Sequence, residues 1–407
     1  MLVSDFDYDL PEERIAKFPP EERGASRLLV LKRETGEIVD SRYAELDEFL
    51  QPGDVLVLND TRVMQSRLFC ELPDGRKREL VVLERHGDEP QRVMYRGKLR
   101  VGDELEIVLS RNAPSGPSSR ASVAPYFPRR KICSSKALSS SSSPDSLESD
   151  REVVTVANIL GNGIAEVESE VPLVELAEKY GTVPLPPYLH RDATEADKKR
   201  YQTVWAREIG SAAAPTASLN MTEDLLERLR AKGVKICYLT LHVGLGTFLP
   251  IRTENLEEHK MHSEWFHIPP ETIEMIRDRR LDISFSGRSS RPSSRGSSLG
   301  PRSDCGSPSK ENVQSSFRVI ALGTTVARTL EYYAATGKTE GEDDIFIYPD
   351  YEFKLVDGLI TNFHAPKSTV LMLASAFAGW DNLKNAYEHA IRENYQFLSY
   401  GDSMLIC

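Results

Sequence analysis

The sequence has 407 residues, of which 40% are hydrophobic and 28% are charged, and its net charge is −11. This composition favours a folded, soluble protein of two or three domains and argues against a wholly disordered chain. The negative charge excludes a generic nucleic-acid coat protein, which binds through a large positive field, but it does not exclude an enzyme with one local basic site.

No apolar run approaches the roughly 20 residues that a transmembrane helix needs, so we expect no membrane association. The first ten residues, MLVSDFDYDL, lack a basic region followed by an apolar stretch, so a secretory signal is not expected. The five cysteines are scattered and include no CxxC, which argues against a disulfide framework and a cysteine-based zinc site. Together these features predict a cytoplasmic protein.

The first part of the chain predicts strands at residues 27–30 and 54–59, where apolar bursts are bounded by turn residues. Short strands separated by turns then continue, and the pair Asp74-Gly75 between two of them is a hairpin signal. We therefore predict a small antiparallel β-barrel domain at residues 66–168. It is inserted into a larger α/β domain made of residues 1–65 and 169–407.

Two serine-rich tracts differ from the rest, at residues 110–149 and 284–316. Each has few large apolar residues and cannot bury enough surface to offset the entropy of ordering, so we predict disordered insertions, one in each domain. One interpretation is a phosphorylated tether for RNA or a protein partner. The other is a tolerated surface insertion or translated non-coding sequence.

In the larger domain, strands alternate with helices. Thr222 is a candidate helix N-cap and Gly233 a candidate helix end, followed by the buried strand VKICYLTLHV. Residues 317–322 and 359–364 are predicted strands, each leading through a polar turn into a helix. This alternation predicts a parallel or mixed sheet in an α/β architecture, with ligands bound beyond the carboxyl ends of the strands.

Four predicted strand ends carry polar or glycine residues that we take as candidate ligand-binding residues. They are Asn59, Asp60 and Arg62; His242, Gly244, Gly246 and Thr247; Thr324, Thr325 and Arg328; and Asn362, His364, Lys367, Ser368 and Thr369. The last two groups open helices whose free N–H groups can bind a carboxylate or phosphate. The alternative is that Thr and Ser merely cap their helices. Neither a dinucleotide fingerprint nor a P-loop is present.

The segment EEHKMHSEWFH places His259, His262 and Glu264 close together in sequence. The spacing is not HExxH, and no second ligand cluster is obvious, so we predict no metal site. General acid–base chemistry is the functional interpretation, because histidine titrates near neutral pH and a nearby carboxylate can raise its basicity. The alternative is a set of surface histidines in a polar loop.

Taken together, these motifs resemble those of the S-adenosylmethionine:tRNA ribosyltransferase-isomerases of queuosine biosynthesis. The matching segments occur in order along nearly the whole chain outside the serine-rich tracts. They include DFDYDLPEERIAKFP, LQPGDVLVLNDTRV, GTVPLPPYLHR, TLHVGLGTF, HKMHSE, ALGTTVARTLE, DIFIYPDY, LITNFHAPKSTVLML and LSYGDSML.

The resemblance implies a larger α/β domain with an inserted β-barrel. It also implies that S-adenosylmethionine is a ribosyl donor, and therefore a substrate, with no further cofactor. The ribosyl unit would be transferred to 7-aminomethyl-7-deazaguanine at the tRNA wobble position and rearranged to epoxyqueuosine, with release of adenine and methionine. We expect tRNA as the partner and a monomeric enzyme.

This chemistry needs a base for the proton on the donor's 5′-carbon and a group that helps adenine to leave. We assign Glu264 or His262 as the base, with His259 beside them, and His242 or His364 to the adenine or acceptor ring. Thr324, Thr325 and Arg328 would hold an anion of the donor or tRNA. Pro215 and Thr216 are also assigned to substrate binding.

The chain departs from the family in one segment. Where the family usually reads APTAGLHF, residues 214–221 read APTASLNM, with Ser218, Asn220 and Met221 in place of Gly, His and Phe. If the family's glycine needs a positive φ, Ser218 is unfavourable at that position. If the family's histidine moves a proton, Asn220 cannot do so. The alternative function is therefore a catalytically impaired homologue that binds tRNA or acts as a scaffold.

Overall fold

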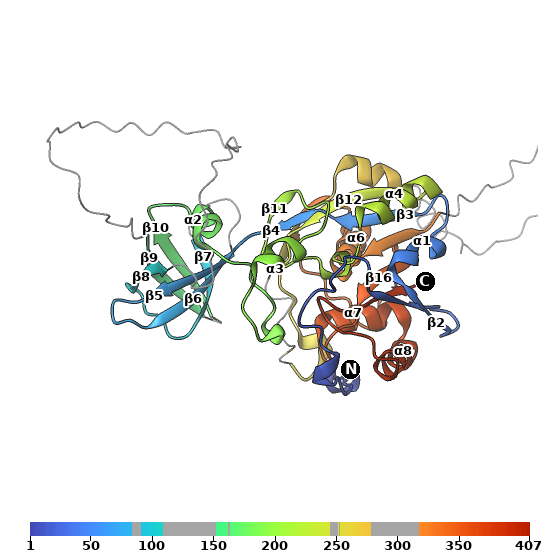
Figure 1. Cartoon of the computed structure of the whole chain (residues 1–407), viewed down its shortest axis with the longest axis horizontal. Helices are drawn as coiled ribbons and strands as arrows, with labels where there is room; N and C mark the ends of the chain where they lie inside the picture. Colours follow the sequence, from blue (N-terminus) through green and yellow to red (C-terminus); the bar gives the residue numbers. More distant parts are fainter. Residues whose placement is uncertain (84–90, 109–151, 162, 245–250, 252, 278–316) are drawn as a thin grey trace, which may run out of the picture. The chain divides into compact units, whose positions relative to one another are not determined.

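The structure is a computed structural model (Figure 1). It describes residues 1–83, 91–108, 152–161, 163–244, 251, 253–277 and 317–407. The two serine-rich tracts lie outside the described residues. The chain divides into two compact units. One combines Met1–Ser66 with Val183–Cys407, and the other is Arg67–Thr182.

The larger unit is built on a nine-stranded sheet. Its strands are β1 (Arg27–Leu31), β2 (Ile38–Arg42), β3 (Val55–Asn59), β12 (Lys235–Leu241), β13 (Glu264–His267), β14 (Val319–Leu322), β15 (Glu340–Asp343), β16 (Gly358–Asn362) and β17 (Ser403–Ile406). Their order is β15-β13-β12-β3-β14-β16-β17-β1-β2. The central four, β12, β3, β14 and β16, are parallel neighbours, whereas β13, β15, β17 and β2 each have antiparallel pairings. The prediction of a mixed sheet is confirmed.

Two hydrophobic cores lie on the two faces of this sheet, because neighbouring residues of a strand point to opposite sides. In β3, Val55 and Val57 belong to one core, and Leu56 and Leu58 belong to the other. The first core is completed by α6 (Thr324–Thr336), α7 (Thr369–Ala378) and α8 (Trp380–Arg392). The second is completed by α1 (Leu46–Phe49) and α4 (Glu223–Lys232).

The ends of α4 follow the sequence prediction. The Thr222 hydroxyl accepts the backbone N–H of Leu225 at 3.1 Å, and Gly233 ends the helix in the left-handed region with φ 94°. A short parallel pair, β4 (Thr61–Val63) and β11 (Glu208–Ser211), and the helix α3 (Glu195–Arg200) complete the larger unit. No helix in the described part of the chain is long and apolar enough to cross a bilayer.

The smaller unit is a closed six-stranded antiparallel barrel, as predicted. Its strands are β5 (Arg67–Glu71), β6 (Lys77–Val82), β7 (Gln91–Arg96), β8 (Glu104–Val108), β9 (Val153–Gly161) and β10 (Ile164–Ser169). β5 and β6 form an antiparallel hairpin whose turn contains Gly75 at φ 81°, a conformation that favours glycine.

The predicted boundary of the barrel at residue 168 is corrected by the structure. The unit continues to Thr182 and includes the helix α2 (Leu173–Tyr180). Leu173, Leu176 and Ala177 are buried in the barrel core because they form the apolar stripe of this short helix. Residues 169–182 therefore belong to the barrel unit and not, as the sequence predicts, to the larger domain.

Candidate active site

The carboxyl ends of the four parallel strands lie at one edge of the sheet, where polar residues were predicted. At the end of β3, the Asn59 side chain donates to the Leu241 carbonyl at 2.9 Å and accepts the Leu241 N–H at 3.1 Å. The neighbouring Asp60 carboxylate accepts the Thr240 hydroxyl at 2.7 Å. These bonds tie β3 to β12. Two of the predicted ligand-binding residues, Asn59 and Asp60, thus hold the ends of these two strands together.

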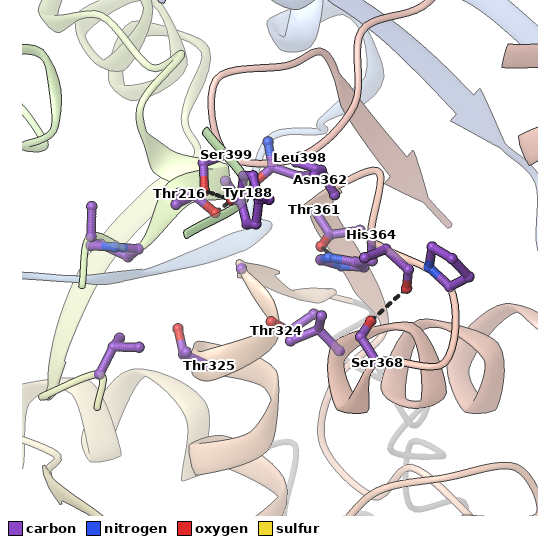
Figure 2. A pocket seen from close by; sticks show the side chains of 18 of the residues that line it. Tyr188, Thr216, Thr324, Thr325, Thr361, Asn362, His364, Ser368, Leu398 and Ser399 are labelled. Atoms are coloured by element: carbon purple, nitrogen blue, oxygen red, sulfur yellow. Dashed lines mark hydrogen bonds between the residues drawn. The ribbon is translucent and has the colours of Figure 1, made fainter. Parts of the chain in front are cut away.

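A cavity of about 180 Å³, which we call the main cavity, lies among the segments that follow β14 and β16. Figure 2 shows Thr324 and Ser368 at the starts of their helices, with Thr361 and His364 nearby. Another part of the wall is formed by Thr216, whose hydroxyl donates to the Asn362 side chain at 2.9 Å. The cavity thus combines residues from segments far apart in sequence.

The first turns of α6 and α7 both face the main cavity. The residue before α6 is Gly323, with φ 102° and ψ 150°, and no side chain caps this helix. At α7, the Ser368 hydroxyl accepts the Leu371 N–H at 3.3 Å. The first N–H groups of a helix have no acceptor within the helix, and the helix dipole adds positive potential there. The uncapped start of α6 is therefore suited to bind a carboxylate.

His364 is held rigidly in the wall of the main cavity. Its Nε2 lies 2.8 Å from the Thr361 hydroxyl, and its backbone N–H donates to the Tyr387 hydroxyl at 2.9 Å. The Tyr8 hydroxyl donates to its carbonyl. Burial lowers the pKa of His364 to about 3, so the imidazole is neutral at physiological pH. It can exchange hydrogen bonds with a ligand without adding charge.

A buried group of three charged residues lies behind the first turn of α6. Arg328 Nη2 is 2.5 Å from Glu264 Oε2, and its Nε is 3.2 Å from Asp343 Oδ2. Burial disfavours the guanidinium charge, but the two carboxylates outweigh it and hold the pKa of Arg328 above its usual value. Glu264 also accepts the Gly244 N–H at 2.7 Å, which fixes the segment after β12.

The other candidate histidines lie outside the main cavity. His242 Nδ1 is 2.7 Å from the Thr61 hydroxyl, and its ring stacks on Trp265 at 5.3 Å between centroids. His259 packs edge-on against Phe346, and burial lowers its pKa. His262 is exposed. None of these three imidazoles lines the main cavity.

The family model described as "Queuosine biosynthesis protein" matches residues 3–283 and 309–406. The chain belongs to this family. A relative from Pelodictyon phaeoclathratiforme is 46% identical, and one from Sulfurihydrogenibium sp. is 41% identical, each over 100% of both chains. Both are named S-adenosylmethionine:tRNA ribosyltransferase-isomerase. A solved S-adenosylmethionine tRNA ribosyltransferase from Thermotoga maritima is 28% identical over 99% of this chain and 100% of its own, with a TM-score of 0.46. The resemblance drawn from the motifs is confirmed.

The structure brings together only part of the site predicted from the sequence. Eight predicted residues line the main cavity: Pro215, Thr216, Thr324, Thr325, Asn362, His364, Lys367 and Ser368. Two more, Arg328 and Thr369, line a smaller neighbouring cavity. The remaining described candidates line neither: Asn59, Asp60, Arg62, His242, Gly244, His259, His262 and Glu264. Gly246 and Thr247 lie outside the described residues. The functional roles of all these residues stay predictions.

Several cavity residues were not singled out from the sequence. They are Tyr188, Val243, Thr361, Val370, Leu398 and Ser399. Most belong to segments that carry the family resemblance, such as GTVPLPPYLHR and LSYGDSML. Their position in these segments is the one feature of the sequence that could have marked them as site residues. Their side chains are mostly apolar or uncharged, so residue type alone did not mark them. Tyr188 and Ser399 share a hydrogen bond between their hydroxyls.

The residues at 218–221 that depart from the family are buried. Ser218 is in the 3-10 turn Thr216–Ser218 and does not have a positive φ, so its backbone does not require glycine. The Asn220 amide donates to the Gly401 carbonyl at 3.0 Å and accepts the Ser26 hydroxyl at 2.8 Å. Met221 is fully buried in the second core. None of the three lines the main cavity.

A metal site was not predicted. Within the described ranges, no three His, Cys, Asp or Glu side chains are grouped as metal ligands would be. The absence of a metal stays a prediction.

Proposed function

We propose that the chain transfers the ribosyl moiety of S-adenosylmethionine to 7-aminomethyl-7-deazaguanine at the tRNA wobble position and isomerises it to epoxyqueuosine, releasing adenine and methionine. Membership of the family supports the general activity, that of a ribosyltransferase-isomerase that uses S-adenosylmethionine. The structural observation that supports the proposal is the main cavity, where two helix starts and polar side chains from separate segments converge.

In this proposal the donor occupies the main cavity. Its methionyl carboxylate binds the free N–H groups of Thr324 and Thr325 at the uncapped start of α6. Neutral His364 and the hydrogen-bonded pair Thr216–Asn362 offer donors and acceptors for the adenine ring. Lys367 is half-exposed beside the cavity and is paired with Asp7 at 2.6 Å, so its charge is partly compensated.

We propose Glu264 or His262 as the base for the 5′-proton. Neither lines the main cavity, so this assignment requires the donor's 5′-carbon to reach beyond that cavity. Glu264 is paired with Arg328 and accepts the Gly244 N–H. These contacts would also suit a residue that holds Arg328 and the segment after β12 in place and does not itself take the proton. Glu264→Gln and His262→Asn should be compared for epoxyqueuosine formation, with circular dichroism as the folding control. Loss of turnover in one folded variant supports that residue, and near-normal turnover in both contradicts the assignment.

The full reaction can be tested with the intact chain, S-adenosylmethionine and tRNA that carries 7-aminomethyl-7-deazaguanine. We expect one adenine released for each epoxyqueuosine formed, measured by chromatography and by mass spectrometry of the digested tRNA. Binding of tRNA without adenine release would favour the impaired homologue, whereas methylated tRNA would contradict ribosyl transfer.

We also propose that the enzyme acts in the cytoplasm as a monomer and without a resident cofactor, since S-adenosylmethionine is consumed as a substrate. Light scattering of the purified chain should give the mass of one chain. Activity should be unchanged by a metal chelator.

A further inference from the structure

A second, smaller cavity of about 20 Å³, which we call the side cavity, adjoins the main cavity. The two share Thr324, Thr325 and Val370 as wall residues, so a ligand in the main cavity lies next to the side cavity. Figure 2 shows Thr324 and Thr325 at the start of their helix, beside the main cavity. A volume of this size holds one group as large as a water molecule or a methyl group.

The walls of the side cavity are mostly apolar. Six of them are hydrophobic side chains: Met261, Ile345, Phe346, Ile347, Val370 and Leu373. A polar or charged group enclosed among such side chains loses its hydration without replacement, whereas a methyl group gains from leaving water. One of them, Phe346, is aromatic, and aromatic rings attract cations at their faces. The surroundings therefore favour a methyl group attached to a cation over a water molecule or an anion.

Two polar residues of the side cavity fit this occupant. Arg328 lies in the wall of the side cavity, but it is already paired with Glu264 and Asp343. Its positive charge is therefore compensated and does not attract a ligand carboxylate into the side cavity. Thr369 is 6% exposed, and its hydroxyl oxygen has no hydrogen-bond partner among the described residues. The hydrogens of a methyl group on a positive sulfur are polarised and can donate weakly to such an oxygen.

We infer that the side cavity is a subsite for the S-methyl group of S-adenosylmethionine, and that it makes the site select this sulfonium over S-adenosylhomocysteine. The inference rests on the proposed function, because it assumes that the donor occupies the main cavity. It adds a specificity-determining surface, formed mainly by Phe346, Leu373 and Thr369, to the proposed site. S-adenosylhomocysteine lacks both the methyl group and the positive charge, so it loses every contact that this surface provides.

Isothermal titration calorimetry on the full chain can test the subsite with three ligands: S-adenosylmethionine, S-adenosylhomocysteine and S-adenosylethionine. For the wild type we expect S-adenosylmethionine to bind about tenfold more tightly than either of the others, because one lacks the methyl group and the other carries a larger ethyl group. Leu373→Val enlarges the side cavity by about one methyl group. It should bring the affinities for the ethyl and methyl ligands within about threefold of each other.

The matched control is Leu383→Val, because Leu383 is equally part of the first core but lines neither cavity. It should lose similar thermal stability and keep the wild-type ratio of affinities. Equal binding of the methionine and homocysteine forms by the wild type would overturn the inference while leaving the proposed function in place. The same ethyl-to-methyl ratio in both variants would also overturn it. Failure of the wild type to bind S-adenosylmethionine at all would contradict the proposed function itself.

Discussion

At the scale of single residues, the proposed contact of the Thr369 hydroxyl with the donor can be tested by using Thr203 as a control. Thr369 and Thr203 are each 6% exposed, and neither hydroxyl has a partner among the described residues. Valine has nearly the same shape, so Thr369→Val and Thr203→Val should each stabilise the fold by about 1 kcal/mol by removing an unsatisfied polar group. Only Thr369 lines the side cavity.

We therefore expect both variants to raise the Tm, and Thr369→Val alone to weaken binding of S-adenosylmethionine, by about threefold for a weak contact. Calorimetry gives both quantities. A lower Tm in Thr369→Val would mean that the hydroxyl already has a partner, and an unchanged Kd would remove it from the proposed methyl subsite.

His364 should leave a signature in the pH dependence of stability. The folded-state pKa of about 3 lies below the ordinary value near 6.5. As the pH falls through 6.5, the unfolded chain binds a proton at this residue that the folded chain does not. The free energy of unfolding should therefore decrease by up to about 1.4 kcal/mol per pH unit until the pH approaches 3.

His364→Asn removes this contribution. Urea titrations between pH 6 and pH 4 should show a shallower loss of stability in the variant than in the wild type, whatever its absolute stability. Equal slopes in the two proteins would contradict a buried neutral imidazole in the cavity wall.

At the scale of elements, the start of α6 depends on its glycine. Gly323 has φ 102° and ψ 150°, a region that side chains with a Cβ rarely adopt, and it lines the main cavity. Gly379, before α8, has a similar strained conformation with φ 79° and ψ 133° but lines neither cavity. Alanine at either position should cost about 1–3 kcal/mol of stability.

Gly323→Ala and Gly379→Ala should thus lower the Tm by comparable amounts. Only Gly323→Ala should also raise the KM for S-adenosylmethionine, because it reorients the N–H groups that we propose bind the donor carboxylate. Steady-state kinetics of adenine release checks this difference. A normal KM in a folded Gly323→Ala variant would exclude the α6 start as the anion site.

The elements themselves were largely predictable because their signals are local. The cap at Thr222, the end at Gly233 and the strand–turn–helix units after β14 and β16 all depend on residues close in sequence. The cavity walls were less predictable. Asn59 and His242 are polar residues at strand ends, yet they bond to neighbouring strand ends rather than line the cavity. An apolar wall residue such as Leu373 has the same sequence pattern as a core residue.

At the scale of the whole molecule, the chain contains two units with separate cores. The barrel core is formed by side chains from its six strands and from α2, and it contains no residue of the larger unit. A sequence pattern can predict that α2 is amphipathic, but it does not say which core receives the apolar stripe. The predicted end of the barrel domain, residue 168, therefore lies before α2.

The boundary can be tested with two fragments, residues 67–182 and residues 67–168. The longer one retains the helix α2, in which Leu173 and Leu176 are each 1% exposed. Because burial of a single leucine is worth about 2–5 kcal/mol, loss of both should cost at least about 4 kcal/mol. Small units have a total stability of only about 5–15 kcal/mol, so the shorter fragment should lose a large part of its stability. Urea denaturation followed by circular dichroism should give a clearly lower midpoint for residues 67–168 than for residues 67–182. Equal midpoints for the two fragments would show that α2 is not needed to complete the barrel core.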